Sequence, residues 1–150
     1  MSSDPNDFTR RVLGWGLAAP LIDGGDIGRD IVLVKRPGSG KLDLGCVVGG
    51  DNLGQDLAMA LTTARGSDPF DVSFGFDGLL ALVEETEPVM IRERLRASVA
   101  KLVAADPRVR TVTAVEVSTT GSGNERTLGL EVSVDTIAGD QAAVSTVVPP

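Results

Sequence analysis

The stretch from residue 87 to residue 117 constrains the fold most, because it predicts a long amphipathic helix that ends at a proline and continues as a strand. Pro88 suits the first helical turn, where a missing N–H costs nothing. Pro107 disfavours helical geometry at Asp106, so we expect the helix to end there. From about Arg108 the chain is rich in Val and Thr, which favours a strand. The apolar residues of the helix follow helical spacing and predict one buried stripe, namely Ile91, Leu95, Val99, Leu102 and Val103.

The C-terminal part predicts an antiparallel hairpin followed by an extended tail. After the strand near residues 108–118 and a polar loop, residues 128–135 alternate between apolar and polar side chains. This period of two is typical of a strand with one buried and one solvated face. The expected inward residues are Leu128, Leu130, Val132 and Val134. The tail, residues 139–150, has β-forming valines and no charge after Asp140, so we expect it to be disordered or donated to a sheet edge.

The N-terminal half predicts a second hairpin and two more helices. Residues 31–35 and 41–48 are apolar runs around a Pro/Gly loop, which is typical of a hairpin. Asp51 or Asn52 suits a helix N-cap, with Gly66 as the stop, and a short helix is expected near residues 76–85. The predicted fold class is therefore α+β. It has an N-terminal β-hairpin, three helices of which the third is long, and a C-terminal antiparallel β-hairpin, packed as one domain over residues 12–138.

Three features of the N-terminal half bear on how the chain meets its surroundings. Residues 1–11 are polar, and we expect a flexible N-terminal segment. Trp15 lies between two glycines and is interpreted as an aromatic anchor that presses onto its own core or onto a neighbouring subunit. Cys46 lies in an apolar run, so we expect a small buried residue rather than a reactive thiol.

The composition excludes several classes of function. The chain has no histidine and one cysteine, which rules out a Ser-His-Asp triad, a Cys-His dyad and a His/Cys zinc site within it. The formal net charge of −7, without a basic run, argues against a general nucleic-acid binder. No apolar run approaches the length of a membrane span, so we do not expect membrane insertion. The glycine-rich segment that ends in Gly40-Lys41 lacks the Walker spacing, and we expect no bound cofactor.

Carboxylates in the sequence raise two other hypotheses, a hydrolase with a pair of glutamates and a calcium site, for which the signals are weak. Glu84, Glu85 and Glu87 precede the long helix, and a lysozyme-like peptidoglycan hydrolase using Glu85 or Glu87 is the alternative enzymatic interpretation. Acids at a helix start are also favoured by the helix dipole alone, which is the simpler account. Scattered aspartates lack the alternating ligand loop of a calcium site. They are Asp43, Asp51, Asp56, Asp68, Asp71 and Asp77.

The Asp106-Pro107-Arg108 corner admits two interpretations. In the first it is a helix stop with an intrahelical or surface ion pair, worth at most about 1 kcal/mol. In the second it is a rigid corner that presents Arg108 for bidentate pairing with a carboxylate of a partner. Sequence patterns alone do not choose between them.

Five short motifs follow one another in an order that resembles a known family. They are Gly14-Trp15-Gly16-Leu17 with Pro20, Gly25-Asp26-Ile27, the helix from Asn52 to Gly66, Phe74-Gly75-Phe76 to Leu79, and Asp106-Pro107-Arg108-Val109. Over about residues 12–136 the chain resembles the baseplate wedge and sheath-initiator family of contractile tails. That family occurs in phages, R-type tailocins, extracellular contractile injection systems and type VI secretion. This chain departs from it at Asp106, where many members have Glu, and at Ala19, where an aromatic residue often precedes the proline.

The resemblance implies a structural protein rather than an enzyme, although the family is sometimes labelled lysozyme-related. It implies six copies per baseplate, with the sheath protein and baseplate wedge proteins as partners and inner tube or hub proteins as further candidates. It also implies assembly in the cytoplasm and incorporation into a phage tail or injection particle. The predicted partner-binding residues are Asp106, Pro107, Arg108, Trp15, Leu128, Leu130 and Val132. An unrelated small α+β binding module remains a further hypothesis.

Overall fold

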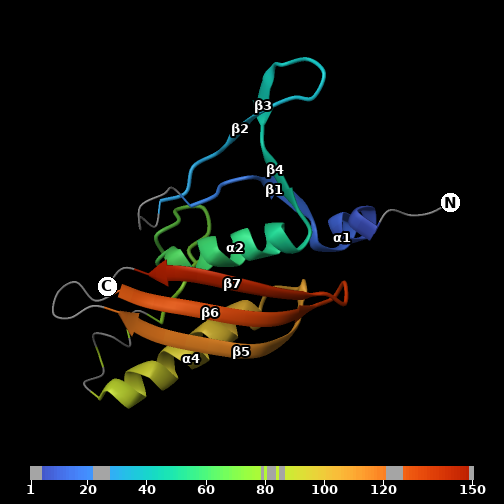
Figure 1. Cartoon of the computed structure of the whole chain (residues 1–150). Helices are drawn as coiled ribbons and strands as arrows, with labels where there is room; N and C mark the ends of the chain where they lie inside the picture. Colours follow the sequence, from blue (N-terminus) through green and yellow to red (C-terminus); the bar gives the residue numbers. More distant parts are fainter. Residues whose placement is uncertain are drawn as a thin grey trace.

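A three-stranded antiparallel sheet with two helices packed on one face forms the body, and a narrow β-ribbon rises from it (Figure 1). The computed structural model describes residues 5–21, 28–78, 80, 84, 87–120 and 127–148. The predicted α+β class is confirmed. The elements are α1 (Pro5–Leu13), β1 (Trp15–Leu17), β2 (Leu33–Lys35), β3 (Leu42–Leu44), β4 (Cys46–Val48), α2 (Gly50–Thr62), α4 (Pro88–Ala104), β5 (Val109–Thr120), β6 (Thr127–Thr136) and β7 (Gln141–Val148).

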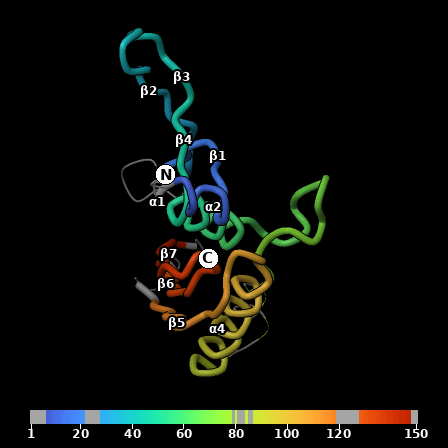
Figure 2. Tube along the Cα trace, turned by 90° about the vertical axis from the view of Figure 1, so that its right-hand side faces the viewer, coloured from blue at the N-terminus to red at the C-terminus, as the bar shows by residue number. Residues whose placement is uncertain are grey.

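Helix α4 and strand β5 form the predicted corner between helix and strand. The helix begins at Pro88 and its last helical residue is Ala104, with Ala105 as the C-cap. The predicted stripe faces the core: Leu95, Val99 and Val103 are buried, and Ile91 and Leu102 are packed against them. Helix α2 lies along β7, at the opposite side of the sheet from β5, and its apolar residues join those of α4 and the strands in one core (Figure 2).

Strand β6 is the central strand of the sheet. Its predicted inward side chains are all buried, namely Leu128, Leu130, Val132 and Val134. It pairs with β5 on one side and with β7 on the other. The predicted C-terminal hairpin is therefore correct but incomplete, because residues 141–148 of the expected tail form a third strand. The turn before β7 brings that strand back along β6, where burial of Val144 stabilises it.

The N-terminal half contains more regular structure than its sequence predicts. Residues 5–13 form helix α1, where a flexible segment was expected, and Leu13 at its end is fully buried. The predicted hairpin exists as β2 paired with β3. Its second strand divides at Gly45, beyond which β4 pairs with β1. Cys46 lies in β4 and is exposed, so the prediction of a buried thiol was wrong.

Two further expectations concern helices. The short helix predicted near residues 76–85 falls largely outside the described residues, although residues 80 and 84 are helical. Within the described part of the chain, no helix is both long and apolar enough to cross a membrane.

Candidate functional site

At the end of helix α1 a carbonyl group without a partner inside the helix lies at the centre of a polar cluster. Gly14, with φ of 83°, turns the chain out of the helix, and its N–H donates to the Arg10 carbonyl at 3.0 Å. The Leu13 carbonyl has no helical partner beyond this point. It accepts hydrogen bonds from Arg108 Nη1 at 3.2 Å and from Asn52 Nδ2 at 3.3 Å. A cation at this position also suits the negative end of the helix dipole.

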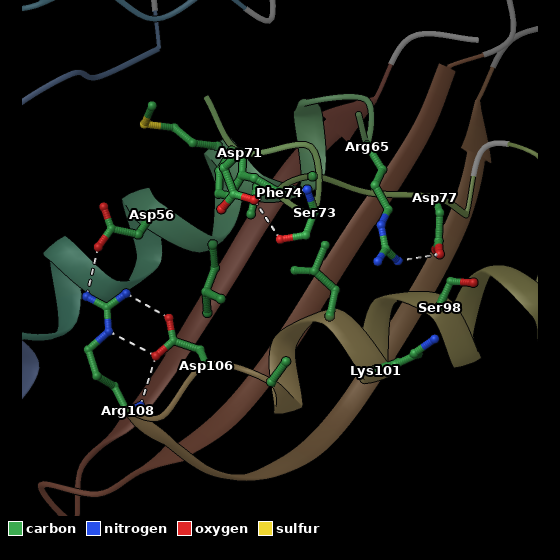
Figure 3. A pocket seen from close by; sticks show the side chains of 16 residues that line it. Asp56, Arg65, Asp71, Ser73, Phe74, Asp77, Ser98, Lys101, Asp106 and Arg108 are labelled. Carbon is green, nitrogen blue, oxygen red and sulfur yellow. Dashed lines mark hydrogen bonds and ion pairs between the residues drawn. The ribbon is translucent and has the colours of Figure 1, made fainter. Parts of the chain in front are cut away.

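Arg108 binds two carboxylates of its own chain. Its Nε donates to Asp106 Oδ1 at 3.0 Å and its Nη2 to Asp106 Oδ2 at 2.7 Å, which is a bidentate pair. Its Nη1 donates to Asp56 Oδ2 of α2 at 2.8 Å (Figure 3). The Arg108 side chain is only 22% exposed and that of Asp106 16%. We call the Leu13 carbonyl, Asn52, Asp56, Asp106 and Arg108 the Arg108 cluster.

The local sequence explains the shape of the corner. The Arg108 main-chain N–H donates to Asp106 Oδ1 at 2.9 Å, so the aspartate side chain closes a turn over Pro107. Pro107 fixes its own φ angle and lies in the middle of this turn. The side chain of Asp106, one methylene shorter than that of a glutamate, reaches both the main chain and the guanidinium group of Arg108. The helix ends just before the corner, as predicted, and Arg108 is engaged within the chain rather than presented to a partner carboxylate.

Both members of the bidentate pair have shifted pKa values. Partial burial acts to raise the pKa of the Asp106 carboxyl, but hydrogen bonds from the Arg108 side chain and main chain, together with its charge, outweigh burial and lower that pKa. The hydrogen bond with Asp106 and the one with Asp56 raise the pKa of the Arg108 guanidinium, against the opposing effect of burial. Both groups therefore stay charged at neutral pH.

The lowered pKa of Asp106 makes the stability of the protein depend on pH. In the unfolded chain an aspartate titrates near about 3.9, so the unfolded state binds more protons than the folded state just below that pH. The contribution of Asp106 is therefore full above about pH 5 and is lost as the pH falls through the folded-state pKa. We expect Asp106→Asn to lower the free energy of unfolding by about 1–2 kcal/mol at pH 7, and by a smaller amount near pH 2.5.

Urea denaturation at the two pH values measures this difference. Asp140→Asn, a substitution of an exposed aspartate, is the control and should change the free energy of unfolding little at either pH. A loss for Asp106→Asn that is equally large at both pH values would contradict the assignment.

Gln55 of α2 attaches strand β1 to the body, and Asn52 of α2 packs against the same strand. Gln55 Nε2 donates to the Leu17 carbonyl at 2.8 Å, and its Oε1 accepts from the Ala19 N–H at 2.7 Å. Asn52 is buried, and its Oδ1 lies where a side chain on Gly16 would begin, 2.6 Å from an ideal Cβ. Glycine at position 16 is therefore a packing requirement. The motifs near residues 14–17, 52–56 and 106–108 meet at this one place.

An open groove of about 700 Å³ lies beside the cluster, between α2, the loop after it and α4 (Figure 3). The aspartates that line it are all engaged. Asp56 and Asp106 pair with Arg108, Asp77 pairs with Arg65 at 3.1 Å, and Asp71 accepts from the Ser73 hydroxyl at 2.6 Å. A general acid at neutral pH needs a raised pKa, whereas the pKa values of Asp71 and Asp106 are both lowered. The lining supports an ionic scaffold rather than acid–base chemistry.

The two edge strands of the sheet differ in how well they are protected. Strand β5 has irregular register near Val109 and again near Val112, and Arg96 Nε of α4 donates to its Val115 carbonyl at 3.0 Å. Bulges and covering side chains are common protections against strand addition. Strand β7 pairs with β6 in unbroken register from Gln141 to Val148. No other described strand pairs with its outer edge.

The outer edge of β7 opens into a second groove, of about 390 Å³. One wall is Ala143 to Ser145, the floor is α2 with Gly54, and the facing wall includes Val32 and Val47. The Thr136 N–H donates to the Asp140 carbonyl at 2.9 Å, so these two residues form a hydrogen-bonded pair at the start of the β6–β7 ladder. Hydrogen-bonded and non-hydrogen-bonded pairs alternate along an antiparallel ladder, so the main-chain N–H and C=O groups of Ala143 and Ser145 point away from β6. The Ala143 carbonyl accordingly lies 4.0 Å from the Cβ position of Gly54. Helix α2 therefore lies against the β7 edge at Ala143, where Gly54 allows a close approach.

The remaining predicted site residues lie in several places. Trp15 is 58% exposed, so it is not an anchor in its own core, and the guanidinium group of Arg10 lies 5.6 Å from its ring centre. Pro107 is exposed at the corner. Three other predicted partner-binding residues lie on β6, the central strand of the sheet. The side chains of Leu128, Leu130 and Val132 are buried in the core, and both sides of the strand are already paired.

The carboxylates of the enzymatic hypothesis do not form a pair among the described residues. Glu84 pairs with Arg94 at 3.0 Å, Glu87 is the exposed N-cap residue of α4, and Glu85 lies outside the described residues, as do Gly25-Asp26-Ile27 and Leu79 of the motifs. In the part of the chain that the structure describes, no group of three acidic or cysteine side chains is arranged to hold a metal ion.

Sequence reasoning missed the roles of Asn52, Gln55 and Asp56 because their partners are remote in sequence. Arg108 is 52 residues from Asp56 and 95 from Leu13. The available signal was the spacing of polar residues on α2, which places Asn52 and Asp56 one turn apart, on one face of the helix.

Comparison with known proteins adds no assignment: no family model matches the chain, and a search of curated proteins gives no significant match.

Proposed function

We propose that this protein is a structural baseplate component of a contractile injection system or phage tail, which joins wedge proteins and starts the first sheath ring by β-strand pairing. The order of motifs in the sequence supports the family assignment, and the unpaired edge of β7 supports the mode of action. In this proposal the sheath protein supplies the added strand. Six copies act in one baseplate, assembled in the cytoplasm, with inner tube or hub proteins as neighbours.

The outer edge of β7 is the observation that carries the proposal. An edge that is regular, uncharged after Asp140 and bordered by a groove is suited to strand addition beyond the part that α2 covers, with main-chain hydrogen bonds supplying affinity. A small monomeric protein usually blocks such an edge, as this chain does at β5. In this proposal β7, which lies in the predicted tail, is the strand that pairs with the sheath protein.

The Arg108 cluster has a supporting role in this proposal. It connects α1, α2 and the corner between α4 and β5 through hydrogen bonds of 2.7–3.3 Å. A scaffold held in this way presents β7 and the corner surface in a fixed geometry, which lowers the entropic cost of binding wedge proteins. The partners would contact the surface of the corner, including Pro107, rather than the guanidinium group of Arg108.

Removing one outward N–H of β7 tests the proposal. Ser145→Pro deletes a main-chain donor on the outer edge and leaves the ladder with β6 intact. We expect particles produced from the gene cluster with this variant to show tubes and baseplates without extended sheath in electron micrographs. The purified variant should also bind the sheath subunit at least about tenfold more weakly, which corresponds to loss of about one main-chain hydrogen bond.

Ser145→Ala is the matched control, because it removes the same hydroxyl but keeps the main-chain N–H. It should assemble sheath like the original protein. Circular dichroism of both variants checks that the fold is retained. Normal sheath growth with folded Ser145→Pro, or particles that lack this protein altogether, would refute the proposal.

A further inference from the structure

A β-hairpin arm, residues 31–44, projects from the body (Figures 1 and 2). Its apolar side chains are exposed to solvent. Exposed apolar residues occur on both of its strands: Ile31, Val32, Leu33, Val34, Leu42 and Leu44. Leu42 is 63% exposed. An isolated two-stranded hairpin is marginally stable in water. Contiguous exposed apolar surface of this kind marks an interaction site, so this arm has the properties of a surface that a partner covers.

The arm is basic although the chain is acidic. It contains Lys35, Arg36 and Lys41 against one acid, Asp43, which gives 3 − 1 = +2. The whole chain has a formal charge of −7, so the remaining residues sum to −7 − 2 = −9. Arg36 Nη2 pairs with Asp43 at 2.6 Å across the strands, which leaves the excess positive charge with the two lysines at the tip. The rest of this chain has the opposite charge to the arm.

The loop of residues 67–74 combines acidic and exposed apolar side chains. Phe70 is 98% exposed, Val72 is exposed as well, and Asp68 and Asp71 are the only charged residues of the loop. Asp68 Oδ1 accepts the Phe70 N–H at 2.8 Å, so the turn holds Phe70 outward. We call this segment the acidic loop. It matches the arm in both respects, because it is apolar and has the opposite charge.

The geometry points to a head-to-tail contact in which the arm of one copy packs on the acidic loop of a second copy of this chain. Within one molecule the two project in different directions, with the arm rising above the body and the loop extending sideways, coloured green in Figure 2. Each copy therefore offers one arm and one loop, and the contact is heterologous. Such contacts close into rings where the rotation allows it and otherwise form filaments.

Self-association of the purified chain is the first measurement. Sedimentation velocity over a range of concentrations should show growth beyond the dimer, since each added copy exposes a new arm or loop. Raising the salt concentration should weaken association, because part of the attraction is between exposed charges. A protein that remains monomeric at all concentrations and at low salt overturns the inference.

Two variants then test the polarity of the contact. The arm variant is Lys35→Glu with Leu42→Ser, and the loop variant is Phe70→Ser with Val72→Ser. All four side chains are exposed, so the fold should persist. Each variant alone should stay monomeric. An equal mixture should form a dimer and nothing larger, because an intact arm on one protein meets an intact loop on the other.

The mixture also keeps the test independent of folding, since a dimer forms only if both variants are folded. A mixture that stays monomeric while the original protein associates would overturn the head-to-tail contact, as would association of either variant alone. The inference goes beyond the proposed function, because it requires no sheath protein. Ser145→Pro should leave self-association unchanged, and the arm variant leaves the β7 edge intact. Each variant therefore tests one proposal without affecting the other.

Discussion

Leu130→Ala should lower the free energy of unfolding by about 2–5 kcal/mol, the usual cost of truncating a buried leucine. Leu130 is 1% exposed and lies in the middle of the core cluster, between the two helices and the sheet. The loss combines the transfer of its apolar atoms with the cavity that remains. Chemical denaturation monitored by circular dichroism measures it. The result decides between a core residue and the partner-binding residue that the sequence suggested.

Leu42→Ala is the matched control for this measurement, because it makes the same chemical change at an exposed site. At concentrations where the protein is monomeric it should shift the free energy of unfolding by no more than about 0.5 kcal/mol. The opposite pattern, in which Leu130→Ala keeps its stability but loses binding to a sheath subunit, would support Leu130 as a partner-binding residue.

Arg108→Met should lower the free energy of unfolding by about 3 kcal/mol. Methionine keeps much of the side-chain length but leaves Asp56 and Asp106 without their cation and the Leu13 carbonyl without one of its donors. Breaking a partly buried ion pair is costly because the remaining charges are uncompensated. Since the cluster connects α1 to the body, protection of α1 against hydrogen exchange should fall as well.

Arg92→Met is the control, because Arg92 is an exposed arginine of α4 and its loss should cost no more than about 0.5 kcal/mol. A double variant, Arg108→Met with Asp106→Leu, should recover part of the lost stability, because it removes the unpaired carboxylate. If Arg108→Met instead unfolds at the same denaturant concentration as the original protein and only fails to bind wedge proteins, Arg108 acts on a partner after all.

Local patterns predicted the helices and strands whose side chains repeat regularly. The stripe on α4 and the alternation on β6 were read correctly because each pattern depends only on the geometry of one element. The class α+β follows from these elements. Helix α1 was missed because most of its residues are polar. Its stabilisation comes from the burial of Leu13 against residues remote in sequence, which no local pattern reports.

The sequence by itself determined which residues form a rigid corner at Asp106-Pro107-Arg108 and which face of each main element is apolar. Only the tertiary structure decided what those features contact. Arg108 meets carboxylates and a carbonyl from three separate elements, and no spacing rule reports contacts over 52 or 95 residues. Likewise, whether a strand is central or at an edge depends on which strands pair beside it. That order makes β6 a core strand and leaves the edge to β7.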